Sequence, residues 1–452
     1  MCYRRHRPHA RKQHRPWMAV AFAAFALARA GAETGLPRFT LEASLEIALR
    51  DAAAMAEARI DERIAETRYG MERARILPHL SAHASYTRQD EATRFETPAG
   101  AFEIGQPDNY AAGIELQQLV YAGGSVRAAL RAAEDYRALT RAETRRTEAA
   151  LRRRVRTAFH ALLLARDAVA VREASLRQVR DAAEDAERRY RAGTGSEFDA
   201  LSARARAAAE RPELLAAQRD YQLARMAFRD LARLPVEDFE PDGELTWTPI
   251  EIGVDAVARL ARERRPEIEA MALQLDLMRA DVRVEQGNRV PEFRVRAAYS
   301  GTDPAVFSAS DGWEWRWEAG VVARWSIFDG GLTRERIRQK RLALDRARVA
   351  DEDLRRAVAL EAAQAALTLR HAAESVEAAS ETVDLAERAL EIARVRFESG
   401  TATWLEFNEA NLALRTARLA HARALRDHMD AVAGTAFAAG LTVEELRAEE
   451  AR

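Results

Sequence analysis

The 452-residue sequence has one cysteine, and aromatic residues make up only 7% of it. Cys2 lies in an N-terminal segment that we predict to be cleaved, so the mature chain can form no disulfide, thiolate zinc site or cysteine nucleophile. HExxH, Walker A and G-x-S-x-G motifs are also absent, and we identify no catalytic constellation. We therefore predict that the protein is not an enzyme, and we expect no cofactor and no metal site.

Long apolar runs are missing as well. Beyond the N-terminus no 18 consecutive residues are apolar, so we expect no membrane-spanning helix there. At the N-terminus, basic residues precede an apolar run at 17–28 and an A-x-A-like site at 30–32, which predicts a signal peptide over residues 1–32. A membrane anchor is the alternative, but about 12 apolar residues are too few to cross a bilayer. Cleavage removes seven positive charges and no negative ones, which changes the formal net charge from −1 to −8 and disfavours nucleic-acid binding.

Two stretches of 68 residues, 125–192 and 332–399, contain neither glycine nor proline. Both are rich in residues that favour helices, and at 1.5 Å per residue each helix would be roughly 100 Å long. Apolar residues in the second stretch recur at steps of four and three, which is the 3.5-residue mean of a coiled coil. We predict one long coiled-coil helix in each stretch. The apolar seam of the second comprises Val358, Ala362, Ala365, Leu369, Ala372, Val376, Ala379, Val383, Ala386, Leu390, Ala393 and Phe397.

A segment of alternating character precedes the second long helix. Every odd position from Trp313 to Ile327 is apolar and most even positions are not, which predicts a strand with one apolar and one polar face. Tryptophan is favoured where barrel strands meet the membrane interface, so we predict lipid contact for its four indoles, with a soluble core as the alternative. Arginines on the polar face of this strand and its neighbour would line a lumen. The indoles are Trp313, Trp315, Trp317 and Trp325, and the arginines are Arg294, Arg296, Arg316 and Arg324.

An internal repeat sets the domain organisation. Pro78 and Tyr86 recur 213 residues later as Pro291 and Tyr299, whereas the Gly-Gly and Gly-Thr pairs that follow recur 207 residues later. The seam recurs in the first long stretch as well, with Arg172 as its single polar position.

The repeat predicts four regions after the signal peptide. They are a first repeat over 33–235, a linker over 236–253, a second repeat over 254–440 and a short charged tail over 441–452. Each repeat consists of a helix, a strand, a loop, a strand, a long helix and a return helix. We predict first helices at 41–76 and 254–288, strands at 80–88, 110–121, 293–301 and 313–328, a polar loop at 88–109, and return helices at 197–234, interrupted near Pro212, and 405–439.

Four strands cannot stand alone in lipid, because their edge N–H and C=O groups would be unpaired. The sheet must close with strands from other copies of the chain. A dimer would supply eight strands and a trimer twelve, and the sequence pattern leaves both possible.

Taken in order and at these spacings, the motifs resemble those of the TolC-type outer-membrane efflux proteins over essentially the whole mature chain. The motifs are the Leu/Val-Pro strand starts, the Gly-Gly strand exits, and the segment 190–201, YRAGTGSEFDAL, echoed at 397–407. The resemblance implies a mainly α fold with a small β part, in which a homotrimer shares a β-barrel continued by an α-helical barrel.

The same resemblance implies a location and a function. The protein would sit in the outer membrane of a Gram-negative bacterium, in contact with its lipid, with the helical part in the periplasm. It would be the channel or exit duct of a tripartite efflux or type I secretion system, joined to a periplasmic adaptor protein and to a proton-driven or ATP-driven inner-membrane pump. Drugs, metal ions and polypeptides all stay open as cargo.

The resemblance also marks two periplasmic tips. Gly193, Thr194, Gly400 and Thr401 would be turns at which the adaptor docks, and helix capping is the alternative reading of the glycines.

Acidic positions follow each tip. In the family that the chain resembles, acidic residues just after the second tip narrow the entrance, and these positions are Glu406 and Glu409 here. They lie three residues apart on one helix face, so the resemblance implies a threefold cation-attracting ring, with an ordinary solvated face as the alternative. Asp199 takes the acidic position of the first tip. Its arginine partner in the best-known members is replaced here by Ala402, so we expect another latch for the closed state, such as packing of Trp404.

Two rival functions are weaker. Strands patterned for lipid in both repeats argue against a periplasmic coiled-coil spacer without a pore. The signal peptide and the mature charge argue against an arginine-rich DNA-binding coiled coil. His421 and His428, seven residues apart, are expected to be an exposed pair and not a metal site.

Overall fold

The computed structural model describes residues 35–90, 93–97, 100–104, 107–303 and 312–450. The predicted signal peptide lies outside them. The chain divides into two compact units, one formed by residues up to Ala48 together with Ala158–Leu245, and the other by Leu49–Thr157 together with the residues from Thr246 onward. Helix α4 (Ser125–Arg191) contributes to both.

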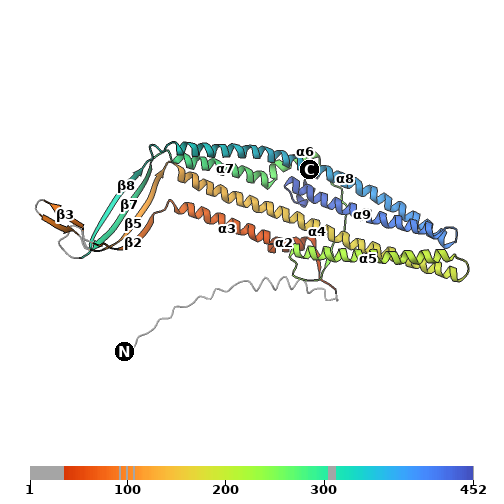
Figure 1. Cartoon of the computed structure of the whole chain (residues 1–452). Helices are drawn as coiled ribbons and strands as arrows, with labels where there is room; N and C mark the ends of the chain where they lie inside the picture. The colour runs from red at the N-terminus through yellow and green to blue at the C-terminus, as the bar shows by residue number, and fades with distance from the viewer. Residues whose placement is uncertain (1–34, 91–92, 98–99, 105–106, 304–311, 451–452) are drawn as a thin grey trace, which may run out of the picture. The chain divides into compact units, whose positions relative to one another are not determined.

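The second unit contains a four-stranded antiparallel sheet in the order β2-β5-β7-β8 (Figure 1). Two of its strands come from each repeat, and the β5–β7 pair joins them. The four predicted strands are therefore confirmed, except that the last ends at Arg324 instead of Phe328. Trp325 leaves the strand, and its indole N–H donates to the carbonyl oxygen of Arg289 at 3.1 Å. The bounds are β2 (His79–Arg88), β5 (Asp108–Ala122), β7 (Glu292–Asp303) and β8 (Glu314–Arg324).

The predicted polar loop at 88–109 is wrong in part. It contains the antiparallel hairpin of β3 (Thr93–Thr97) and β4 (Gly100–Ile104). Each segment contains a short alternation of polar and apolar residues, Arg94-Phe95-Glu96 in β3 and Phe102-Glu103-Ile104 in β4, and this is the pattern of a strand.

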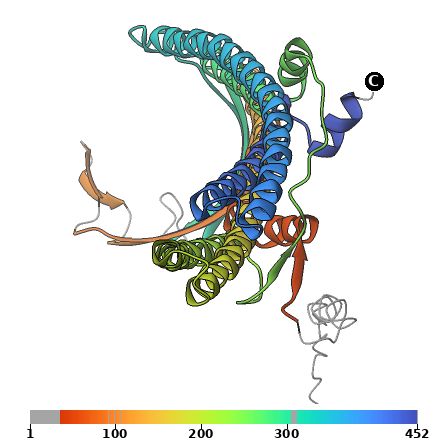
Figure 2. The same cartoon turned by 90° about the vertical axis from the view of Figure 1, so that its right-hand side faces the viewer.

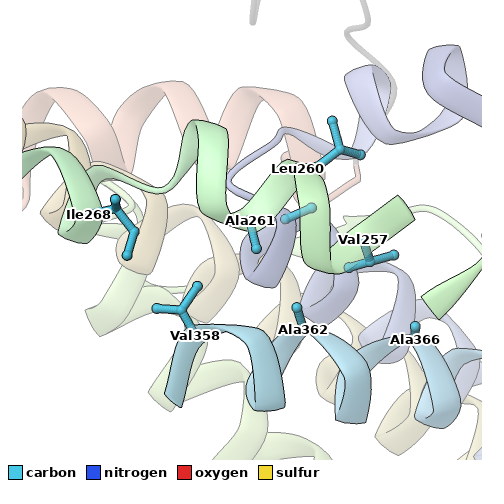
Figure 3. Close-up of a cluster of buried hydrophobic side chains, with 8 residues drawn as sticks. Val257, Leu260, Ala261, Ile268, Val358, Ala362 and Ala366 are labelled. Carbon is cyan, nitrogen blue, oxygen red and sulfur yellow. The ribbon is translucent and has the colours of Figure 1, made fainter. Parts of the chain in front are cut away.

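Helices make up most of the rest of the second unit. The predicted long helix is confirmed as α8 (Leu332–Glu398), which Figure 2 shows as one smoothly curved helix, and α9 (Trp404–Ala439) packs against it. All twelve predicted seam positions of α8 are buried or half-buried. Alanine at Ala362 and Ala366 lets α6 (Val254–Arg264) approach closely, and Val257 and Ala261 lie over these alanines (Figure 3).

Both predicted first helices are broken. The helix at 254–288 divides at Arg265 into α6 and α7 (Pro266–Gly287), because a residue before proline is driven to extended backbone, here φ −69° and ψ 128°. The helix at 41–76 divides at Ala52 into α2 (Leu41–Asp51) and α3 (Ala53–Ala74). Part of the tail also folds, as α10 (Val443–Glu450), whose Leu446 is fully buried.

The first unit is a helical hairpin with a small aromatic core. The later half of α4 faces α5 (Glu197–Ala232), which runs through Pro212 without the interruption that we predicted. A parallel pair of β1 (Arg38–Thr40) and β6 (Glu240–Asp242) closes the other end of the unit. Part of the predicted linker is thus core, because Phe239 is fully buried. The ring contacts are Phe159–Phe228 at 5.4 Å, Phe228–Phe239 at 6.0 Å and Phe39–Phe239 at 5.9 Å.

Candidate functional site

The two hairpin ends turn on glycines in the left-handed conformation. We call residues 190–201 tip one and residues 397–408 tip two. Gly193 and Gly400 both have φ of 74°, which favours glycine at a helix C-terminus. Their N–H groups donate to the carbonyl oxygens of Tyr190 at 3.0 Å and Phe397 at 3.1 Å. These glycines therefore cap helices, whatever else they contact.

The threonine after each glycine completes the cap. Thr194 donates to the carbonyl oxygen of Arg189 from its N–H at 2.9 Å and from its hydroxyl at 3.2 Å. Thr401 makes the same two contacts with the carbonyl oxygen of Arg396, at 2.8 Å and 3.1 Å. Both threonine hydroxyls are thus used inside their own turns.

The helix after each tip starts with a hydroxyl cap. Ser196 accepts from the N–H of Phe198 at 3.1 Å, and Thr403 accepts from the N–H of Glu406 at 3.3 Å. Thr403-x-x-Glu406 is the capping-box pattern, a signal that our sequence reasoning missed. Glu406 therefore has a structural role that stands beside any role at an entrance.

The predicted acidic residues differ in their surroundings. Glu406 lies 3.7 Å from the guanidinium of Arg396, so its charge is partly balanced within tip two. Glu409 is exposed on the same helix, and its carboxylate forms no ion pair or hydrogen bond within the described part of the chain. Asp199 likewise has no ion pair among the described residues. Glu409 is the less balanced of the two proposed ring carboxylates.

An aromatic cluster distinguishes tip two. Phe397, Trp404 and Phe407 are buried against one another, with ring centroids 5.5–6.0 Å apart. Trp404 thus packs inside its own hairpin.

Tip one has no such cluster, because Glu197 and Ala200 stand at the positions of Trp404 and Phe407. Instead it exposes apolar side chains: Tyr190, Phe198, which is 75% exposed, and Leu201, which is 64% exposed.

The sheet brings the predicted aromatic side chains onto one face. Trp315 and Trp317 lie on β8, where Trp317 stands opposite Tyr299, and Trp315 stacks on Tyr299 at 5.2 Å. Both indoles are exposed. Trp313 and Trp325 lie just outside the strand, one at each end, and are exposed as well.

Among the described residues, no helix is both long and apolar enough to cross a membrane. Within the same residues, no group of three His, Cys, Asp or Glu side chains could hold a metal ion. The expectation of an exposed histidine pair is wrong, because His428 is buried, and neither of its ring nitrogens has a hydrogen-bond partner in the described structure.

Both repeats of the sequence match one known protein family. The sequence profile of the outer membrane efflux proteins matches residues 44–232 and 257–441. The chain belongs to this family. Its members are outer-membrane efflux channels and not enzymes, in agreement with the resemblance noted above.

Solved structures show the same fold at low sequence identity. A membrane protein from Pseudomonas aeruginosa is 20% identical with a TM-score of 0.76, and the alignment covers 89% of this chain and 90% of that one. The outer membrane protein VceC from Vibrio cholerae has the same identity and TM-score, with 89% and 96% covered. The MtrE outer membrane channel from Neisseria gonorrhoeae is 19% identical with a TM-score of 0.74, with 89% of each chain covered. No curated protein is similar enough in sequence to count as a relative.

Proposed function

We propose that this efflux-family chain is the exit duct of a tripartite efflux or type I secretion system, and that three copies form it. The observation that carries the proposal is the four-stranded sheet, whose edge strands β2 and β8 each have a neighbour on one side only among the described residues. In lipid an open edge would leave N–H and C=O groups unpaired, so the sheet must continue into other copies. Three copies give a twelve-stranded barrel.

The two faces of the sheet support its orientation. Trp315 and Trp317 share the apolar face with Tyr299, while Arg296 and Arg316 point to the other face. Lipid contact for the indoles and water contact for the arginines follow, because aromatic side chains favour the membrane interface and unpaired charge is costly in lipid.

The tips are the proposed docking points for a periplasmic adaptor and, through it, for an inner-membrane pump. Gly193-Thr194 and Gly400-Thr401 shape two exposed turns of the same geometry. Phe198 adds exposed apolar surface at tip one. Exposed apolar side chains on a rigid turn suit a protein partner.

The proposed entrance ring consists of Glu406 and Glu409 from each copy. Three Glu409 carboxylates without ion pairs would attract cations at a narrow entrance. Glu406 would add less, since Arg396 lies 3.7 Å from it.

Single-channel recording in planar bilayers tests this function. Wild-type protein should form a cation-selective pore. A Glu406→Gln/Glu409→Gln variant should lose selectivity. The control is Glu237→Gln, which changes an exposed linker carboxylate that forms no ion pair with any described residue and should leave the selectivity unchanged. A conducting pore that is indifferent to the double change would contradict the ring and keep the duct. Folded protein that inserts but never conducts, even with shortened tips, would favour the spacer function.

A further inference from the structure

The polar face of the sheet carries charges of both signs in equal number. Residues paired directly across an antiparallel ladder point to the same side, so the register fixes which side chains share this face. The even-numbered residues of β7 and β8, which include Arg296 and Arg316, pair with one another and share this face. Glu115 on β5 pairs with Ala298 and so points to the same face. The charged residues on this face are Arg294, Arg296, Arg316 and Arg324, with Glu115, Glu292, Glu314 and Glu318.

Arg296 occupies the centre of this face and contacts two carboxylates. Its Nε lies 2.6 Å from Oε1 of Glu115 on β5, and its Nη2 lies 3.4 Å from Oε1 of Glu318 on β8. The guanidinium therefore bridges three adjacent strands. Two donors on one planar group suit such bridging, and lysine could offer only a point charge.

Glycine opposite Arg296 leaves space for this contact. Gly320 is the direct partner of Arg296 in the β7–β8 ladder, and no heavy atom lies where its Cβ would be. The guanidinium can thus reach across β8 to Glu318, two residues away from Gly320 along the strand.

The cluster of Glu115, Arg296 and Glu318 carries one net negative charge per chain. Glu115 and Glu318 lie on either side of Ala298 in one row across the sheet, so removal of Arg296 would leave two carboxylates on this face without the cation that bridges them. Arg316, which forms no ion pair within the described residues, lies opposite Ser300 and adds a positive charge nearby.

We infer that Arg296 sets the ion selectivity of the β part of the duct by balancing Glu115 and Glu318. With Arg296 in place the wall of the barrel discriminates weakly between cations and anions, and the tip acids determine the selectivity of the whole pore. This inference rests on the proposed trimeric duct, in which symmetry would repeat the cluster three times at one height of the barrel.

Reversal potentials across bilayers under a KCl gradient test the inference. Arg296→Gln should raise the potassium-to-chloride permeability ratio at least about twofold at low salt, where screening is weak. Glu115→Gln/Glu318→Gln should shift the ratio toward chloride. Arg296→Lys keeps the charge and should stay close to wild type.

The outcomes separate this inference from the function itself. A conducting, correctly assembled Arg296→Gln channel with an unchanged ratio, or with a shift toward chloride, overturns the role of Arg296 and leaves the duct intact. Absence of conduction in the wild type, even with shortened tips, overturns the duct, and the role of Arg296 with it. A shift in Arg296→Lys as large as in Arg296→Gln would show that shape and not charge is responsible, which also contradicts the inference.

Discussion

The hairpins α4–α5 and α8–α9 follow one plan but are held together differently. Their helices have equal lengths, 67 and 36 residues, at an offset of 207. In the first hairpin Glu210, only 3% exposed, lies 3.1 Å from Arg206 and 3.9 Å from Arg172, and Arg172 also pairs with Glu213 at 3.1 Å. The matching positions of the second hairpin are all alanine: Ala379, Ala413, Ala417 and Ala420.

This difference explains the one polar position in an otherwise apolar seam. Arg172 interrupts the seam of α4 because α5 supplies a buried carboxylate for it. Alanine interfaces allow close approach but specify register weakly, whereas a buried ionic contact allows only one register. The first hairpin therefore has a buried ionic contact at mid-length. The second has an exposed ion pair between Glu387 and Arg418 at 2.8 Å, and at its tip the Phe397, Trp404 and Phe407 rings pack together.

The largest expected effect comes from removing the buried carboxylate of Glu210 while its arginine partners stay in place. Glu210→Ala leaves Arg172 and Arg206 without their buried partner and should lower the free energy of unfolding by about 3 kcal/mol, since both guanidiniums keep some access to solvent. Urea unfolding followed by circular dichroism measures the change, and hydrogen exchange should localise it to α5.

The second hairpin supplies the control for this change. Replacing Arg172, Arg206, Glu210 and Glu213 together by alanine reproduces the residues of α8–α9 at these positions, and the stability should be close to wild type. Equal destabilisation of the single and quadruple variants would mean that the ionic contacts are not the cause.

A smaller and equal effect is expected at the two tips. Gly193→Ala and Gly400→Ala should each destabilise the hairpin end by about 1–2 kcal/mol, because both glycines have a φ of 74°, which is unfavourable for alanine. The added Cβ would meet no other atom at either site, so no clash should make the two losses differ. Hydrogen exchange at the tip amides measures both. Gly434→Ala, inside α9 and also unobstructed, should instead stabilise the helix by about 0.5–1 kcal/mol. Unequal losses at the two tips would contradict the equivalence of the turns.

The smallest effect concerns pH. Burial, and after it the charge of Arg447, lowers the pKa of His428. The unfolded state then binds a proton that the folded state does not, so stability is complete above the ordinary pKa of about 6.5 and falls as the pH drops below it. Between pH 7.5 and 5.5 the loss should be about 1 kcal/mol.

The matching position in the first hairpin is Tyr221. Burial raises the pKa of this tyrosine above its ordinary value, so its hydroxyl stays neutral over this range. Hydrogen exchange should therefore report the acid effect in α9 and not in α5. His428→Leu should remove it, and His421→Leu should not. Persistence of the effect in His428→Leu would assign it to another group.

Much of the fold follows from sequence pattern, and the exceptions have physical causes. The period-2 pattern of 313–327, the 3.5-residue seam and the internal repeat together predicted the four sheet strands and both long helices. The break before Pro266 was readable from the proline itself, whereas the break at Ala52 has no glycine or proline signal and depends on tertiary packing. Helix α5 continues through Pro212 although the proline removes one helical hydrogen bond, so packing of the helix outweighs this loss.

The sites were less predictable than the fold. The internal repeat located the turn glycines, and the family resemblance indicated the tip acids. The pairing of Glu406 with Arg396 depends on side-chain geometry that neither contains. Glu210 gave no signal in α5 alone. Only the polar Arg172 in the seam of α4 pointed to a buried acidic partner.

Disulfide trapping between copies tests the trimeric barrel most directly. The only natural cysteine is Cys2, so a cysteine at Ala84 on β2 combined with one at Trp317, Ala319 or Val321 on β8 would report pairing cleanly. Within one chain β2 and β8 are separated by two strands, about 14 Å, which is too far for a disulfide. Our account predicts covalent trimers in membranes for at least one register. Dimers as the largest product, or monomers throughout the panel, would contradict it.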